Sequence, residues 1–212
     1  MDILNEISQR LQQGNAKAVK ELVQQAIDEG IEAQTILEEG LMAGMNIIGE
    51  QFKHNQIYLP QVLIDARAMN PGTELLKQLL VSDGVKSKGT VVLGTVKGDL
   101  HDIGKNLVRM MMEGKGLEVI DLGIDVPSEK FIEVAKKENA QIIACSALLT
   151  TTMNEMKAVV DAAKEAGIRE DVTIMIGGAP VTDSFRESIG ADIYTPDAAS
   201  AADEAARVCE AI

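Results

Sequence analysis

The spacing of apolar residues predicts only helices in the first part of the chain. Apolar side chains recur there every three or four positions, as on the buried face of an amphipathic helix. Four such stripes lie in residues 3–11, 19–27, 36–48 and 62–69. The fourth helix is expected to begin near Pro60, and a short fifth helix to follow Pro71-Gly72. Residues 1–86 are therefore expected to form a small helical bundle.

After residue 89 short apolar runs alternate with amphipathic segments. The runs predict strands at 90–96, 117–121, 141–145, 172–177 and 191–194. The segments predict helices at 103–114, 128–138, 152–166, 181–188 and 197–210. This alternation predicts an α/β domain with a doubly wound parallel sheet over residues 87–212. Residues 82–89, with Gly84 and Gly89, have the composition of a linker and are a reasonable place for a hinge.

Composition limits the partners and the setting. With 212 residues, of which 46% are hydrophobic, the chain can bury a substantial core. A formal net charge of −13, without a long run of Lys or Arg, argues against nucleic acid and anionic membranes as partners. Neither a signal peptide nor a transmembrane span is expected. The two cysteines favour a reducing, cytoplasmic setting, with Cys145 as a small buried strand residue.

The loop after the first expected strand carries the most informative motif, Asp99-Leu100-His101-Asp102-Ile103-Gly104. Ligands of parallel α/β sheets bind at the carboxyl ends of the strands, where this D-x-H-x-x-G spacing falls. A histidine whose second ring nitrogen reaches a carboxylate is the usual arrangement of a metal ligand, and His101 is one of two histidines. The simpler alternative is a helix start with Asp102 as N-cap and His101 as an incidental surface residue.

Two other kinds of site fit the motif poorly. A phosphate-binding loop needs four residues between its Gly and its Gly-Lys, whereas five lie between Gly98 and Gly104-Lys105. Asn106 also stands where that loop needs Ser or Thr. One His and one Asp cannot complete a zinc shell, and the two cysteines lie far apart in the sequence.

Other loops that follow strands are expected at the same edge of the sheet, at residues 122–127, 146–152 and 177–181. The second of them contains Ser146, Leu148, Thr150 and Thr152. Its hydroxyls can be explained as caps of the next helix, and Gly177-Gly178 as an ordinary turn. Their shared position with His101 is what favours a ligand site, because a glycine pair lets a bulky group approach the backbone closely.

Taken in order, D-x-H-x-x-G, S-x-L and G-G resemble the cobalamin-binding module of methionine synthase and of corrinoid methyl-carrier proteins. The residues are Asp99 to Gly104, Ser146-Ala147-Leu148 and Gly177-Gly178, and the resemblance covers nearly the whole chain. It implies a flavodoxin-like, Rossmann-like domain. The implied cofactor is cobalamin or a related corrinoid, bound with its benzimidazole displaced.

The resemblance also implies a role for each matching residue. His101 would be the lower axial cobalt ligand, and Asp99 would hydrogen-bond its other ring nitrogen. Thr152 stands where methionine synthase has the serine of a proton relay, so a hydroxyl is kept on a β-branched side chain. The rest of the cofactor site would comprise Gly98, Leu100, Asp102, Ile103, Gly104, Ser146, Leu148, Thr150, Gly177 and Gly178.

The helical half resembles the same family. Residues 52–62 are similar to the cap segment that covers the upper corrin face, so Phe52 and Leu59 would shield that face. Ordinary packing in the bundle core is the alternative for both side chains. His54 is expected in a solvated loop.

The resemblance implies a methyl-carrier subunit rather than a complete enzyme. Such a subunit accepts a methyl group on cobalt from a substrate-specific methyltransferase. It delivers the group to an acceptor methyltransferase whose substrate is a thiol or tetrahydrofolate, and a reductive activase is a further expected partner. The motifs are closest to carriers of methylamine, methanol and betaine systems. The alternatives are a cobalamin-dependent sensor or regulator and the small subunit of an adenosylcobalamin mutase.

Overall fold

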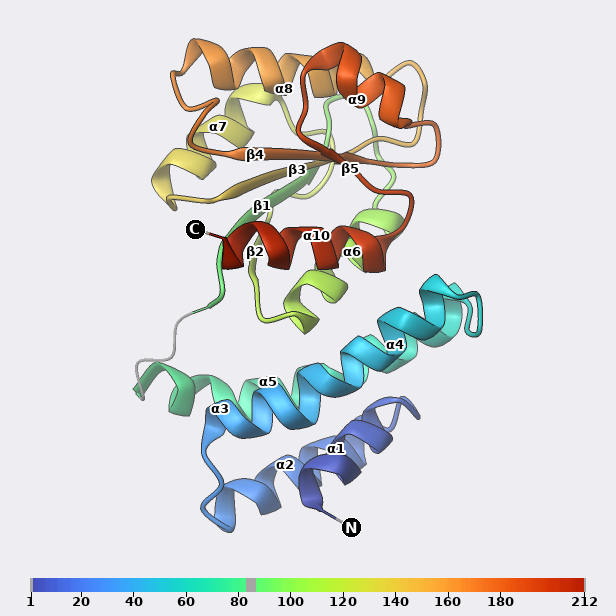
Figure 1. Ribbon diagram of the computed structural model, residues 1–212, viewed down its shortest axis with the longest axis vertical. Coiled ribbons are helices and arrows are strands. Elements are labelled where there is room, and N and C mark those ends of the chain that lie inside the picture. Colours follow the sequence, from blue (N-terminus) through green and yellow to red (C-terminus); the bar gives the residue numbers. More distant parts are fainter. Residues whose placement is uncertain (1, 83–86, 212) are drawn as a thin grey trace. The chain divides into compact units, whose positions relative to one another are not determined.

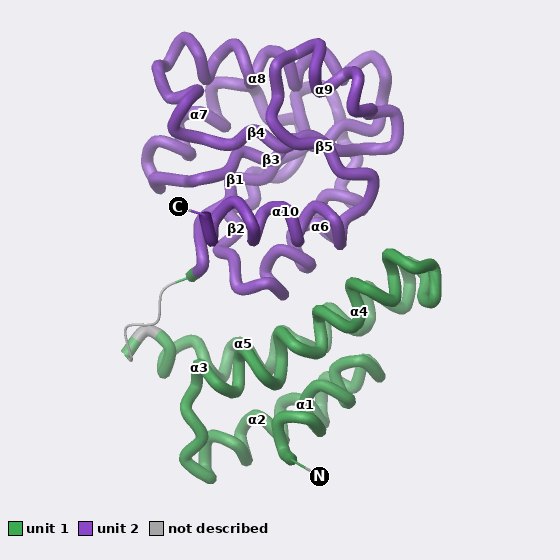
Figure 2. Tube along the Cα trace, in the orientation of Figure 1, with its two compact units in different colours: residues 1–87 green, residues 88–212 purple. Residues whose placement is uncertain are grey.

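The computed structural model describes residues 2–82 and 87–211, and its Cα trace divides into two compact units, residues 1–87 and 88–212 (Figure 2). The boundary between the units lies one residue beyond the position expected from the sequence. Half of the expected linker, residues 83–86 with Gly84, lies outside the described residues. Gly89 is required by close packing, because a Cβ there would lie 2.3 Å from the sulfur of Cys209.

The first unit is a bundle of helices, as the apolar stripes predict (Figure 1). They are α1 (Ile3–Leu11), α2 (Ala16–Asp28), α3 (Ala33–Thr35), η1 (Ile36–Met42), α4 (Ala43–Lys53) and α5 (Leu59–Ser82). The side chain of Asn15 accepts a hydrogen bond from the amide of Ala18 and so caps α2. α3, η1 and α4 follow one another without a break, and residues 36–42 have the wider turns of a π-helix.

The expected helix break at Pro71-Gly72 is wrong, because α5 continues through both residues. Pro71 removes one backbone hydrogen bond from the helix. A Cβ on Gly72 would lie 3.1 Å from Val23 and 3.2 Å from Leu41, so glycine lets α5 pack closely against α2 and η1. This packing offsets the lost hydrogen bond. Even this longest helix lacks the apolar character of a membrane span, and no other helix of the described residues has it.

The second unit is a five-stranded parallel sheet between two layers of helices (Figure 1). The strands are β1 (Thr90–Thr95), β2 (Glu118–Asp121), β3 (Ile142–Ser146), β4 (Thr173–Gly177) and β5 (Ile193–Tyr194), in the spatial order β2-β1-β3-β4-β5. One face carries α6 (Ile103–Gly114) and α10 (Ala198–Glu210). The other carries α7 (Ser128–Lys137), α8 (Asn154–Glu165) and α9 (Asp183–Ile189). The predicted doubly wound parallel sheet is confirmed.

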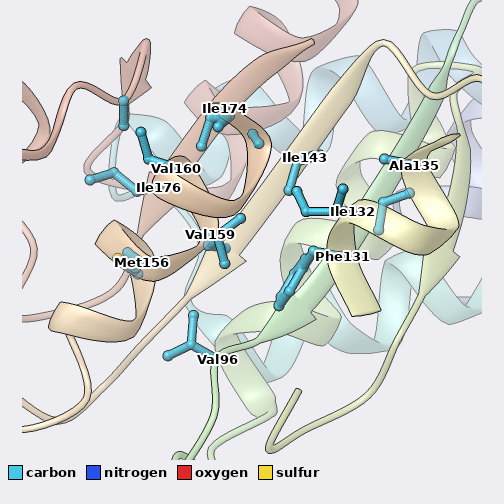
Figure 3. Packing of buried hydrophobic residues seen from close by; sticks show 14 of the residues in the cluster. Val96, Phe131, Ile132, Ala135, Ile143, Met156, Val159, Val160, Ile174 and Ile176 are labelled. Carbon is cyan, nitrogen blue, oxygen red and sulfur yellow. The ribbon is translucent and has the colours of Figure 1, made fainter. Parts of the chain in front are cut away.

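A hydrophobic core fills the space between the sheet and α7 and α8 (Figure 3). Phe131 of α7, Val159 of α8 and Ile143 of β3 are almost fully buried there. A Cβ on Gly94 would lie 2.8 Å from the ring of Phe131, so glycine in β1 makes room for this ring. The central strands are buried on both faces, and this explains why their sequences are continuous apolar runs.

Three of the strands end level with one another at the carboxyl edge of the sheet. Thr95 at the end of β1 pairs with Ser146 at the end of β3, which pairs with Gly177 at the end of β4. The loops that follow these strands therefore start side by side. α8 begins at Asn154, two residues later than expected, because Thr152 belongs to the loop and hydrogen-bonds across to Asp99.

Candidate functional site

Asp99 is the buried centre of the carboxyl edge. It lies in the loop after β1, where its amide donates to the carbonyl of Val96 at 3.1 Å and its side chain has no exposed surface. Gly98 precedes it with a φ of +78°, a left-handed conformation that glycine adopts without strain. The turn directs a carboxylate into the protein at the point where the loops after β1 and β3 meet.

Both oxygens of the Asp99 carboxylate accept hydrogen bonds. Oδ1 accepts the amide of His101 at 3.1 Å and lies 2.7 Å from Nδ1 of the same residue. Oδ2 accepts the amides of Leu148 at 2.8 Å and Leu149 at 3.2 Å, and the hydroxyl of Thr152 at 2.8 Å. One side chain thus joins the His101 loop to the loop after β3.

These hydrogen bonds keep the carboxylate ionised although it is buried. Burial alone would raise the pKa of Asp99. The ring of His101, the amides of Leu148 and His101 and the hydroxyl of Thr152 together outweigh burial and hold the pKa well below its usual range. An ionised Asp99 is an acceptor only, so it favours the proton on Nδ1 of His101.

His101 is held on one side and open on the other. Nδ1 faces Asp99, and the backbone carbonyl accepts the buried hydroxyl of Thr95 at 2.9 Å. The side chain is nevertheless 49% exposed. With the proton on Nδ1, the unprotonated Nε2 carries the lone pair that can bind a metal. The Asp99–His101 pair therefore has the arrangement of a metal-ligand histidine with its carboxylate partner.

Large apolar side chains are exposed around the carboxyl edge. Leu100 and Ile103, which flank His101, are 66% and 62% exposed. Ile124, Leu148 and Leu149, in the loops after β2 and β3, are each more than 40% exposed. A cluster of this kind is typical of a surface that binds an apolar group. Ile124 and Leu149 were not predicted as site residues from the sequence, although apolar residues in loops at the ligand edge were a usable signal.

The glycines expected in the site differ in what surrounds them. Gly178 has a φ of +139°, and a Cβ there would lie 1.8 Å from the carbonyl oxygen of Ala147, so the fold itself requires glycine. A Cβ on Gly177 would only touch the carbonyl of Thr195 at 3.9 Å, and one on Gly104 would meet nothing within 4 Å. The space over Gly177 and Gly104 is therefore available to a ligand.

The structure brings most of the expected residues to this edge. Hydrogen bonds join Asp99, His101, Leu148 and Thr152, and strand register places Ser146 beside Gly177. Asp102 and Thr150 are exposed in the same loops. The side chain of Asp102 does not cap α6, although that was the simpler explanation; it accepts a hydrogen bond from Asn106. Phe52, near the end of α4, and Leu59, at the start of α5, are both partly buried in the helical unit.

Comparison with known proteins defines the class. The family model described as B12 binding domain matches residues 89–206, and a second model with the same description matches residues 3–77. The α/β unit with its histidine site and the helical unit are thus both of B12-binding type. The chain belongs to the corrinoid proteins of this B12-binding family, and its cofactor is a corrinoid.

Individual relatives are similar over most of the chain. Trimethylamine corrinoid protein 1 of Methanosarcina acetivorans is 47% identical over 82% of both chains, and dimethylamine corrinoid protein 1 of the same organism is 43% identical over 94% of both. Among solved structures, the methanol:cobalamin methyltransferase complex MtaBC from Methanosarcina barkeri matches with a TM-score of 0.88 and 33% identity, covering 99% of this chain and 80% of that one. A cobalamin-binding protein from Desulfitobacterium hafniense matches with a TM-score of 0.81 and 32% identity, covering 98% of each chain.

Proposed function

We propose that this protein carries a methyl group on the cobalt of a bound corrinoid, from a substrate-specific methyltransferase to an acceptor methyltransferase. The observation that carries the proposal is the Asp99–His101 pair, which presents a ring nitrogen at the ligand edge of a B12-binding domain. The similarity to corrinoid proteins named for trimethylamine and dimethylamine supports an amine as the source of the methyl group. It gives no support to the sensor and mutase alternatives.

The residues of the edge fit a corrinoid. His101 would supply one nitrogen ligand to the cobalt that the corrinoid macrocycle holds. Exposed Leu100, Ile103 and Leu148 offer apolar surface to a large ring. The open space over Gly104 and Gly177 suits the displaced nucleotide tail, which Ser146 and Thr150 can meet with hydroxyl groups.

The protein's own part in the reaction is to hold and tune the axial ligand. When bound, the corrinoid supplies the metal centre that accepts and releases the methyl group. His101 would hold the cobalt through Nε2, while Asp99 Oδ1 accepts the proton of Nδ1 and would make the imidazole a stronger electron donor. Thr152 donates to Asp99 Oδ2, so its hydroxyl lowers the basicity of the carboxylate and completes the relay. Phe52 and Leu59 are proposed to shield the opposite face of the bound corrinoid.

The partners follow from the proposed carrier role. A corrinoid carrier depends on other proteins for the activation of donor and acceptor, as the naming of MtaBC as a methyltransferase complex supports for one relative. We infer a substrate-specific methyltransferase, an acceptor methyltransferase acting on a thiol or tetrahydrofolate, and a reductive activase. A cytoplasmic setting, supported by two free cysteines, stays a prediction.

A methylation assay tests this function. The chain is loaded with hydroxocobalamin, reduced to the cobalt(I) state and mixed with trimethylamine, dimethylamine or methanol, with and without a purified methyltransferase for that substrate. We expect the cobalt(I) absorbance to disappear only when the matching enzyme is present. Methylation at a comparable rate without any enzyme would contradict the carrier role. Failure with every enzyme, in a chain that holds cobalamin, would favour a sensor.

A further inference from the structure

A charged side chain is buried close to the site without an assigned role. Lys105 lies in the first turn of α6, four residues after His101, and is only 2% exposed. Its Nζ donates to both oxygens of Asp121 at 2.6 Å and to Oδ1 of Asn106 at 2.8 Å. Burying an ammonium group costs free energy unless its hydrogen bonds are satisfied, as they are here.

Asp121 connects this lysine to the turn after β2. It is the last residue of that strand, and its Oδ1 also accepts the amide of Gly123 at 2.9 Å. Gly123 has a φ of +85°, so the carboxylate stabilises a turn that begins in a left-handed conformation. Burial would raise the pKa of Asp121, but Lys105, the Gly123 amide and Arg109 lower it and keep the carboxylate ionised.

The same turn is hydrogen-bonded to the loop that carries His101. Asp125 accepts the amide of Gly98 at 2.7 Å on Oδ1, and its own amide donates to the carbonyl of Asp99 at 3.0 Å. At the other end of the loop, Asn106 donates to Oδ2 of Asp102 at 3.1 Å. Lys105, Asn106, Asp121 and Asp125 thus hold residues 98–102 from both ends, and we call these four residues the loop clamp.

We propose that Lys105 is a positioning residue for His101, acting through the loop clamp. The ion pair with Asp121 fixes the start of α6 to the end of β2, and the turn after β2 then fixes Gly98 and Asp99. The loop is therefore ordered in the cofactor-free protein, and it loses little conformational entropy when His101 binds cobalt. This inference rests on the proposed role of His101 as the cobalt ligand.

The test separates positioning from general stability. Lys105→Met removes the charge and keeps most of the side-chain volume. Lys105→Met with Asp121→Asn leaves no unpaired charge buried, and so serves if the single variant does not fold. Lys115→Met is the matched control, because it breaks another ion pair of similar length, with Asp203 at 2.6 Å, just beyond the other end of α6.

Two measurements are made on each chain. Amide hydrogen exchange of the cofactor-free protein reports the order of residues 98–103. Titration with hydroxocobalamin, followed by electron paramagnetic resonance of the cobalt(II) form, reports affinity and coordination by a histidine nitrogen. We expect the Lys105 variants to exchange faster in this loop, to bind about 10- to 100-fold more weakly and to lose most of the nitrogen splitting. The Lys115 variant should match the wild type.

The outcomes distinguish this inference from the proposed function. Lys105 variants that melt earlier but keep the loop exchange, the affinity and the nitrogen splitting of the wild type would overturn the positioning role. Absence of histidine splitting in the wild type would instead overturn the ligand role of His101. In that case the exchange data would still show whether the clamp orders the loop.

Discussion

Asp99 accepts hydrogen bonds on both carboxylate oxygens, and its two sides face different neighbours. Oδ1 faces the amide and ring of His101, whereas Oδ2 faces the amides of Leu148 and Leu149 and the hydroxyl of Thr152. Each of these neighbours is a donor. A side chain of the same shape that carries one NH₂ group must therefore oppose a donor on one side or the other.

Asp99→Asn should destabilise the cofactor-free protein by about 1–3 kcal/mol at neutral pH, because a buried donor loses its acceptor. The folded-state pKa of Asp99 lies below the unfolded-state value, so its stabilisation is present above the unfolded-state pKa and is lost as pH falls through the folded-state pKa. Denaturant unfolding from neutral to acidic pH should therefore show the two chains converging on acidification. A constant difference between them would contradict an ionised Asp99.

Thr152→Ala tests whether the hydroxyl acts through Asp99. The substitution removes the hydrogen bond to Oδ2, whereas Thr152→Ser keeps it and is the matched control. A double-mutant cycle with Asp99→Asn, measured as free energy of unfolding, should give a coupling energy of about 0.5–3 kcal/mol. Additive effects of the two substitutions would separate Thr152 from the relay.

Gly177, the last residue of β4, and Gly178, which follows it, are glycines for different structural reasons. Gly178→Ala places a Cβ against the carbonyl of Ala147 and should destabilise the fold by at least about 1–3 kcal/mol. In Gly177→Ala the added Cβ contacts only the carbonyl of Thr195, so stability should stay almost unchanged while corrinoid binding weakens. Thermal unfolding and hydroxocobalamin titration of both variants measure this. A Gly177 variant with unchanged affinity would show that this glycine does not line the cofactor site.

Elements with a strong pattern were predictable from the sequence. The helix after His101 was expected at 103–114 and is α6 over those residues, because Asp102 ends the loop and apolar Leu107, Met111 and Met112 face the core. The continuation of α5 through Pro71 was not predictable, since helix propensity does not include the packing of Gly72 against α2 and η1. The late start of α8 was also not predictable, because it depends on the hydrogen bond between Thr152 and Asp99, which lies in a distant loop.

The residues that contact a ligand were predictable, because function fixes their types. The residues that only hold them in place were less predictable. Asp99 and His101 follow from motif spacing and Thr152 from the resemblance to methionine synthase, and hydrogen bonds join Asp99 to both other residues. Lys105 gave no signal, since a lysine in the first turn of a helix is ordinarily solvated. Asp125 was missed because its role depends on a positive φ of 53° and on a partner 27 positions earlier, neither of which has a sequence pattern.

At the scale of the whole molecule, a helical unit and an α/β unit each match a B12-binding family model. Phe52→Ala and Leu59→Ala test the proposed contribution of the helical unit to one cofactor site. If these side chains shield the corrinoid, photolysis of the methylcobalamin form should give more product, because fewer caged radicals recombine. Leu41→Ala is the control. Leu41 is fully buried, so this substitution should lower stability by about 2–5 kcal/mol without changing the photolysis yield. Equal yields from all three variants would assign Phe52 and Leu59 to ordinary packing.

The central claim is that His101 is the axial ligand of the bound corrinoid, and nitrogen isotopes test it directly. The chain contains two histidines, so labelling with nitrogen-15 histidine marks only His54 and His101. In the cobalt(II) form, electron paramagnetic resonance should show each cobalt line split into a doublet by nitrogen-15, in place of the triplet of the unlabelled protein. His54→Ala should keep the doublet and His101→Ala should abolish it. A triplet that persists in the labelled wild type would mean that the benzimidazole of the cofactor remains bound, and would contradict the account.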